Sequence, residues 1–192
     1  MTQRAQERIP PGQVQTEKWP VLTYGEPPLI ETAEWRFSIS GLVEEPAVLT
    51  WQDLTSLPLT KVVCDMHCVT RWSKLDNEFE GARVRDLMAR VRLKPNASHV
   101  MVHGYGGYTT NLPLADLMGD DVLLAYKYEG KPLERDHGGP CRLLVPKLYL
   151  WKSAKWVNGF ELMAKDRPGF WERAGYHIYG DPWKEERHGW NL

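Results

Sequence analysis

The chain has 192 residues, 42% of them hydrophobic and 26% charged, with a formal net charge of −1. This composition is typical of one globular domain, and the near-zero charge excludes a global field that would attract nucleic acid or anionic lipid. No apolar run approaches the length of a membrane span. The cysteines number only three, and a small, odd number argues against a disulfide framework. We therefore expect a cytoplasmic protein without a membrane span.

The first element in chain order is an extended arm. Prolines are frequent in residues 1–33, which predicts an irregular N-terminal arm packed on a domain of residues 34–192. Such an arm can line a pocket. Period-two alternation then predicts a strand at residues 35–41, and Thr50 is a good N-cap for a short helix that ends before Pro58.

The rest of the chain alternates short strands with short helices. Strands are predicted at residues 59–63, 99–103, 108–112 and 122–126, and helices at residues 84–91 and 113–118. Many short strands with interspersed helices indicate an α+β fold, a mixed and strand-rich single domain.

The first concentration of unusual chemistry is C-D-M-H-C-V-T-R-W-S at residues 64–73. Cys68 follows an apolar, strand-like run, and a thiolate held there could bind a soft metal. A zinc site of Cys64, His67 and Cys68 is an alternative, although a closed structural site needs a second ligand cluster that the sequence lacks. A further alternative is that all three cysteines are small buried residues.

A second concentration is D-H-G-G-P-C-R at residues 136–142, with W-K-S-A-K-W at residues 151–156. Glycines let a backbone approach a ligand closely, and Arg142, Lys152 and Lys155 could hold a phosphate while Ser153 donates a hydrogen bond. The alternative is that His137 begins an ordinary turn and that the lysines lie on a solvated face.

Three motifs in this order resemble the molybdopterin-binding domain of sulfite oxidase-type enzymes. They are C-V-T-R-W-S (68–73), G-G-P-C-R-L-L-V-P (138–146) and W-K-S-A-K-W-V (151–157). The chain is similar in particular to the small bacterial sulfite oxidase-like proteins, and the likeness extends to the catalytic subunit of the periplasmic methionine-sulfoxide reductase.

The resemblance implies a molybdenum–molybdopterin cofactor with Cys68 as the protein's thiolate ligand to the metal, leaving Cys64 and Cys141 structural. It implies these cofactor-binding residues: Tyr24, Gly25, His137, Arg142, Ser153, Ala154 and Lys155. A high-valent metal bound by a dithiolene and oxo groups suits one further soft anionic donor, and the cofactor carries the two-electron chemistry.

Arg71 is the second candidate catalytic residue, because its guanidinium could face an oxyanion substrate near the metal. It could equally pair with a surface carboxylate, and His67 could support the metal site or simply cap a loop. The arginine-rich pocket of sulfite oxidases is not evident around Cys68, which weakens sulfite as the substrate. The aromatic tail at residues 169–183 is expected to pack back on the domain, near the site.

The sequence has no C-x-x-C-H haem motif, no twin-arginine leader and no room for the extra domains of animal sulfite oxidases, so we expect no haem and a separate electron-transfer partner. The leading hypothesis is an oxidoreductase that moves an oxygen atom to or from a small sulfur- or nitrogen-containing substrate. A non-catalytic molybdopterin-binding or regulatory module and a zinc-stabilised interaction domain are the alternatives. Oligomeric state is not predicted.

Overall fold

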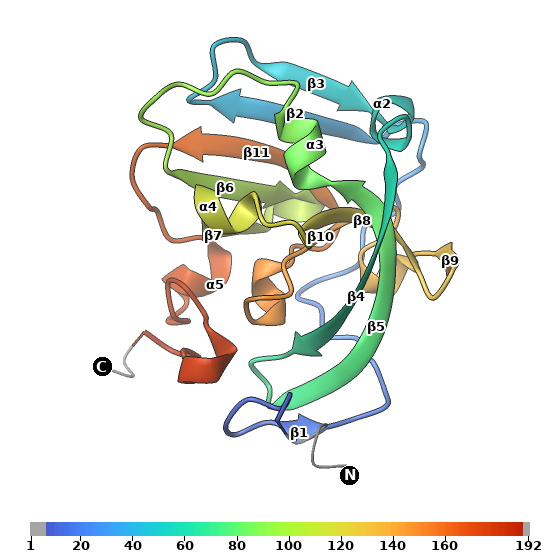
Figure 1. Ribbon diagram of the computed structural model, residues 1–192, viewed down its shortest axis with the longest axis vertical. Coiled ribbons are helices and arrows are strands. Elements are labelled where there is room, and N and C mark those ends of the chain that lie inside the picture. The colour runs from blue at the N-terminus through green and yellow to red at the C-terminus, as the bar shows by residue number, and fades with distance from the viewer. Residues whose placement is uncertain (1–6, 190–192) are drawn as a thin grey trace.

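The computed structural model describes residues 7–189, which form two β-sheets around a shared core (Figure 1). Residues 1–6 of the predicted arm and 190–192 of the predicted domain lie outside the described part. Strands dominate and the helices are short, so the prediction of a mixed, strand-rich single domain is confirmed.

One sheet has five strands in the order β3-β2-β11-β6-β7. Its strands are β2 (Arg36–Gly41), β3 (Ala47–Thr50), β6 (His99–Gly104), β7 (Thr109–Pro113) and β11 (Val157–Met163). β11 runs parallel to β2 and antiparallel to β6. In β2 the predicted alternation is present, because Phe37 and Ile39 are buried while Arg36 and Ser38 are exposed.

The other sheet has six strands and is organised around the longest of them, β5 (Trp72–Arg83). Its remaining strands are β1 (Val14–Gln15), β4 (Leu59–His67), β8 (Leu123–Tyr128), β9 (Lys131–Pro132) and β10 (Arg142–Leu144). β4 and β5 form a long curved hairpin along one side of the molecule (Figure 1), and β1 pairs in parallel with the start of β5. The strand predicted at residues 59–63 therefore continues to His67.

The helices are short connectors. The α-helices are α2 (Trp51–Thr55), α3 (Val84–Met88), α4 (Leu114–Leu117) and α5 (Phe170–Arg173), and the 3-10 turns are η1 (Tyr105–Gly107), η2 (Arg135–His137), η3 (Leu150–Lys152) and η4 (Pro182–Lys184). The predicted N-cap at Thr50 is confirmed as a capping box: Asp53 N donates to Thr50 Oγ1 at 3.2 Å, and Thr50 N donates to Asp53 Oδ2 at 2.8 Å.

The main core lies between the two sheets and contains fully buried aromatic residues. The Phe37 ring contacts Phe160 edge-on with centroids 4.8 Å apart, and Trp35 stacks at 5.8 Å from Phe37. A smaller cluster around Met66 and Phe79 supports the β4–β5 hairpin from inside. Both clusters exclude water from the sheet faces that they cover.

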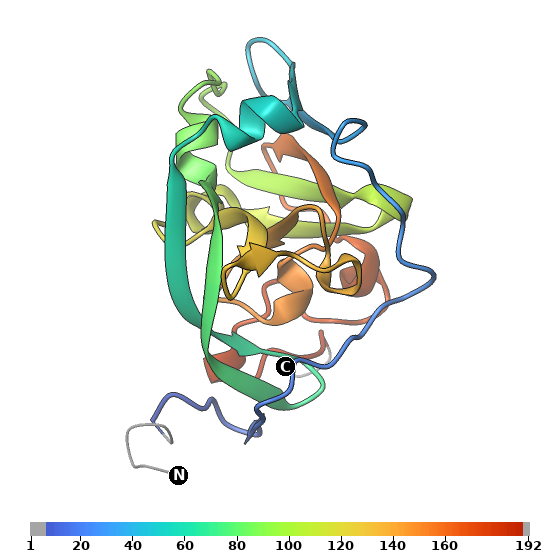
Figure 2. The ribbon, with the colours of Figure 1, turned by 90° about the vertical axis from the view of Figure 1, so that its right-hand side faces the viewer.

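Both terminal segments lie against this framework. Residues 7–33 run as an extended trace along the outside of the domain (Figure 2), and the boundary at residue 33 stays a prediction. The C-terminal segment after β11 folds back, because α5 packs beside β7 and the Glu172 carboxylate accepts a hydrogen bond from Thr110 at 2.8 Å. The expectation that the aromatic tail returns to the domain is confirmed. Within residues 7–189 no helix is long and apolar enough to span a membrane.

Candidate functional site

A cavity of about 550 Å³ lies where the N-terminal arm, the β4–β5 hairpin and the C-terminal segment meet. Seven of the residues predicted from sequence line it: Tyr24, Gly25, Cys68, Arg142, Ser153, Ala154 and Lys155. They come from four stretches of sequence that the fold brings to one place. Such a large, largely apolar pocket with a few convergent polar groups is typical of a ligand site.

Cys68 lies at the tip of the β4–β5 hairpin, which explains how a strand delivers its thiol to the cavity. Cys68 N donates to Trp72 O at 2.9 Å and Arg71 N donates to Cys68 O at 3.0 Å. Arg71 has a φ of 74°, so the loop is a turn followed by a left-handed residue. The strand ends at His67, and the loop places Cys68, Val69 and Thr70 on the cavity wall before β5 begins at Trp72.

The Cys68 thiol is buried, with 7% exposure, and is not in a disulfide. Burial raises its pKa, while the Thr70 hydroxyl, which donates to Sγ at 3.1 Å, and the charge of Arg187 oppose that rise. A thiol in such surroundings ionises readily only when a positive charge, such as a metal ion, binds to it.

Arg142 supplies buried positive charge on another wall. Its guanidinium donates to the backbone oxygens of His137 and Ser153, both at 2.8 Å, and lies 5.4 Å from the Trp19 ring centroid. Burial lowers its pKa to about 10. Among residues 7–189 no carboxylate forms an ion pair with Arg142.

Lys155 adds a second cation. Its Nζ donates to Leu22 O at 3.0 Å, to Thr23 Oγ1 at 2.8 Å and to Asp136 O at 2.6 Å, so it ties the N-terminal arm to η2. Burial lowers its pKa to about 8, and the nearby charge of Arg142 acts in the same direction. Two cations held by neutral oxygens leave the cavity with a positive charge that an anion such as a phosphate would balance.

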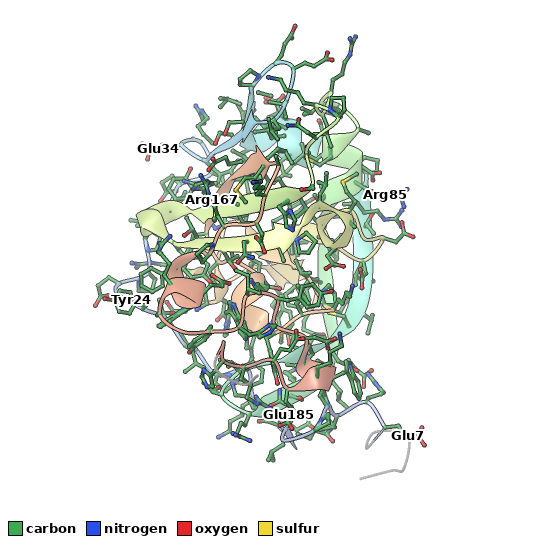
Figure 3. The ribbon with its side chains drawn as sticks, turned by 90° about the vertical axis from the view of Figure 1, so that its left-hand side faces the viewer. Glu7, Tyr24, Glu34, Arg85, Arg167 and Glu185 are labelled. Atoms are coloured by element: carbon green, nitrogen blue, oxygen red, sulfur yellow. The ribbon has the colours of Figure 1, made fainter. Side chains whose placement is uncertain are left out.

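The remaining walls are aromatic and open. Tyr24 lies at the edge of the molecule beside α5 (Figure 3), and its ring centroid is 5.1 Å from that of Phe170. On the η1 loop, Gly106 and Gly107 have φ values of 82° and 83°, and added Cβ atoms would meet nothing within 4 Å. Only glycine adopts this backbone without strain, so the loop presents bare backbone to the cavity.

The structure corrects the sequence-based expectation for Lys152. Its side chain is fully buried, with Nζ 2.6 Å from Glu172 Oε1 and 2.9 Å from Asn111 Oδ1. This ion pair joins η3 to α5 behind the cavity wall, so the ammonium is not available to a phosphate. Lys152 holds the site in shape instead.

Arg71 and His137 are not brought to the cavity wall. Arg71 is exposed and is not among the residues that line the cavity. The His137 ring stacks on Trp19, which does line the cavity, with centroids 3.8 Å apart, and its Nδ1 is buried without a hydrogen-bond partner among the described residues. His137 therefore lies one layer behind the surface that a ligand would touch.

Sequence reasoning missed several residues of the site. Trp19 on the arm, Tyr108 after η1 and Tyr176 after α5 line the cavity. Burial raises the pKa of Tyr176, and a charge on Cys68 acts in the same direction. The aromatic tail was the signal for Tyr176, whereas nothing in the spacing marks Trp19 or Tyr108.

The zinc alternative receives no support. Within the described part of the chain, no three His, Cys, Asp or Glu side chains lie close enough together to hold a metal ion. Burial raises the pKa of Cys64 to about 12 and lowers that of His67 to about 4, and the His67 Nδ1 lies 2.8 Å from Ser73 Oγ. These two residues behave as parts of the hairpin interior.

The cavity fits a cofactor that binds a thiolate at one end and carries an anion at the other. Cys68 offers the thiol, and Arg142 and Lys155 offer unbalanced positive charge. The bare η1 backbone and the aromatic walls leave space for a flat ring system between them. These features together, rather than any single motif, indicate the class of protein, namely one that binds such a cofactor.

The model of the oxidoreductase molybdopterin-binding domain matches residues 24–171, which is more than half of the chain. The chain belongs to this family. It is 43% identical over 185 residues to the uncharacterized oxidoreductase YuiH of Bacillus subtilis (strain 168), and the match covers 96% of this chain and 93% of that protein. The resemblance stated from the motifs is thereby confirmed.

Larger relatives share the same domain. The sulfite oxidase of Arabidopsis thaliana is 26% identical over 192 residues, which is 81% of this chain and 49% of that enzyme. The crystal structure of the sulfane dehydrogenase SoxCD from Paracoccus pantotrophus superposes with a TM-score of 0.68 at 25% identity, covering 78% of this chain and 42% of that one. The chain thus spans about half or less of these two proteins.

Proposed function

We propose that this protein is a molybdenum-dependent oxidoreductase that transfers an oxygen atom to or from a small sulfur- or nitrogen-containing substrate. A molybdenum–molybdopterin cofactor without haem would be the redox group, and a separate carrier would exchange two electrons with it. Three free cysteines support a reducing compartment, so we place the protein in the cytoplasm.

One observation carries the proposal: the Cys68 thiol and the two cations Arg142 and Lys155 line the same cavity although they come from distant parts of the sequence. A structural cysteine needs no cations nearby, and a phosphate site alone needs no thiol. The combination suits a metal-bearing cofactor that also carries a phosphate.

Each residue has a distinct part in this function. Cys68 would bind the metal as thiolate, and the thiol proton would leave on binding. Arg142 and Lys155 would hold the phosphate. The Ser153 hydroxyl accepts from Val145 N at 2.9 Å, which orients the side chain, and its O–H would donate to the cofactor. When bound, the cofactor would supply oxygen exchange and storage of two electrons. Water would be excluded from the cavity by the aromatic side chains of Tyr176, Trp151 and Trp171.

The surroundings favour an uncharged substrate group over an oxyanion. Arg142 and Lys155 are committed to the cofactor's phosphate, and Arg71 does not line the cavity. The rest of the wall near Cys68 is aromatic, formed by residues such as Trp72 and Tyr176. A wall of this kind binds a substrate through the substrate's apolar surface and one polar atom.

Metal analysis tests the proposal. Wild-type protein from a molybdenum-replete host should hold about one molybdenum per chain. Cys68→Ala should lose both the metal and oxygen-atom transfer, because Cys68 is the only soft donor among the described residues that line the cavity. Cys141→Ala, which removes a fully buried thiol outside the cavity, is the matched control and should keep both. Full metal content with full activity in Cys68→Ala would contradict the proposal. Metal that stays bound but never changes redox state would point instead to a non-catalytic carrier.

A further inference from the structure

Arg187, on the C-terminal segment, is a buried cation with 3% exposure that no sequence motif marks. Its Nη1 donates to Val69 O at 3.0 Å, inside the loop that follows Cys68. Its Nη2 donates to Pro11 O at 3.3 Å and to Gly12 O at 3.4 Å on the N-terminal arm. One side chain therefore joins both terminal segments to the Cys68 loop.

Gln13 completes the connection. Its side-chain oxygen accepts from Arg187 at 3.4 Å, and its Nε2 donates to Cys68 O at 3.0 Å and to Trp72 O at 3.3 Å. The pairing of β1 with β5 holds Gln13 in place, since Val14 N donates to Arg71 O at 2.9 Å. The carbonyl of Cys68 is thus fixed by a residue that Arg187 itself positions.

The charge of Arg187 is only partly balanced. Glu185 is its one carboxylate neighbour among the described residues, at 3.7 Å, and the Glu185 side chain is 47% exposed. Solvent weakens such a pair, whereas a buried cation acts strongly on groups nearby. The space is also tight, because a Cβ at Gly12 would lie 3.2 Å from Arg187 Nη2 and would meet Glu185 Oε1.

We propose that Arg187 is a positioning residue for the metal ligand Cys68: together with Gln13 it fixes the hairpin loop, and its buried charge favours the reduced state of the metal centre. This inference rests on the proposed function. Groups that support a metal ligand from behind commonly set its orientation and the electronic properties of the metal.

The test compares Arg187→Gln, Arg187→Lys and Gln13→Leu with Arg173→Gln, which removes an exposed cation from the same segment. Metal analysis measures the molybdenum that remains after incubation, and a redox titration followed by electron paramagnetic resonance measures the midpoint potential. Arg187→Gln should lose metal about tenfold faster and should shift the potential downward, because reduction adds negative charge that the lost cation no longer stabilises.

The other variants separate charge from anchoring. Arg187→Lys should keep the wild-type potential but lose metal faster, since an ammonium cannot reach the loop and the arm together. Gln13→Leu should behave likewise, and Arg173→Gln should match wild type.

A midpoint potential equal to that of wild type in Arg187→Gln would overturn the inference. So would a potential shift in Arg187→Lys as large as the shift in Arg187→Gln. If Arg187→Gln does not fold, wild-type metal retention in both Arg187→Lys and Gln13→Leu overturns it. Absence of molybdenum from wild-type protein would instead overturn the proposed function.

Discussion

At the residue scale, burial governs the titration of the groups around the hairpin. It raises the pKa values of Cys64 and Cys68 and lowers that of His67, and in each case its effect exceeds that of any neighbouring charge. Neutral forms are therefore favoured throughout the hairpin interior. A bound metal would be the exception, because it stabilises the thiolate directly.

His67 should make the fold acid-sensitive. The unfolded chain binds a proton at His67 near its usual pKa of about 6.5, whereas the folded protein binds it only near about 4. Between these values the unfolded state holds more protons, so stability falls as pH falls. Lowering the pH from 7 to 5 should cost wild type about 2 kcal/mol more than His67→Gln.

Urea unfolding at the two pH values measures this difference. His103→Gln is the control, because the His103 side chain is 40% exposed on the other sheet. Equal losses of stability in wild type and His67→Gln would show that His67 is not the acid-sensitive group.

At the element scale, the Cys68 hairpin depends on a left-handed residue that is not glycine. Arg71 adopts a φ of 74° that L-residues rarely take. Arg71→Gly should therefore raise the free energy of unfolding by about 0.5–1 kcal/mol, whereas Val69→Gly, at an ordinary φ in the same loop, should lower it. Chemical denaturation measures both variants. A loss of stability in Arg71→Gly would show that its side-chain contacts outweigh the backbone strain.

A second stabilising feature at the element scale is the buried ion pair between Lys152 on η3 and Glu172 on α5. Removing one partner leaves an uncompensated buried charge, so Lys152→Met should lower the free energy of unfolding by about 3–5 kcal/mol. The double variant Lys152→Met/Glu172→Leu should recover part of that loss. Thermal or urea unfolding of the single and double variants measures the coupling, and additive losses would contradict it.

At the scale of the whole molecule, the site is a junction of both terminal segments with the sheets. The N-terminal arm runs along the outside of the domain (Figure 2), and Lys155 Nζ ties it down through Leu22 O and Thr23 Oγ1. Lys155→Met should accelerate amide hydrogen exchange in residues 21–26, because the arm loses its charged anchor while the sheets do not. Lys165→Met, at an exposed position, is the control. Exchange that stays unchanged in the arm would mean that Trp19, stacked on His137, holds it without Lys155.

Pattern alone predicted the elements whose signal is local. The alternation at residues 35–41, the cap at Thr50 and the strand predicted at residues 59–63 depend on neighbours in sequence. The structure contains all three, the strand as the longer β4 (Leu59–His67). Strands β1, β3, β5, β9, β10 and β11 were missed. β5 carries the polar residues Ser73 and Asn77, which the fold buries. β10 and β11 begin in segments that were interpreted as a phosphate-binding site.

The sequence by itself determined the fold class, the family, and seven of the residues that line the cavity, because cysteine, glycine and cation motifs keep their chemistry wherever the chain folds. Only the tertiary structure decided which cations face the cavity. Lys152 turned inward to Glu172, Arg71 turned outward after the hairpin, and Arg187 came from the far end of the chain to support Cys68. The physical reason is that side-chain direction depends on backbone turns and on partners distant in sequence, which no local spacing records.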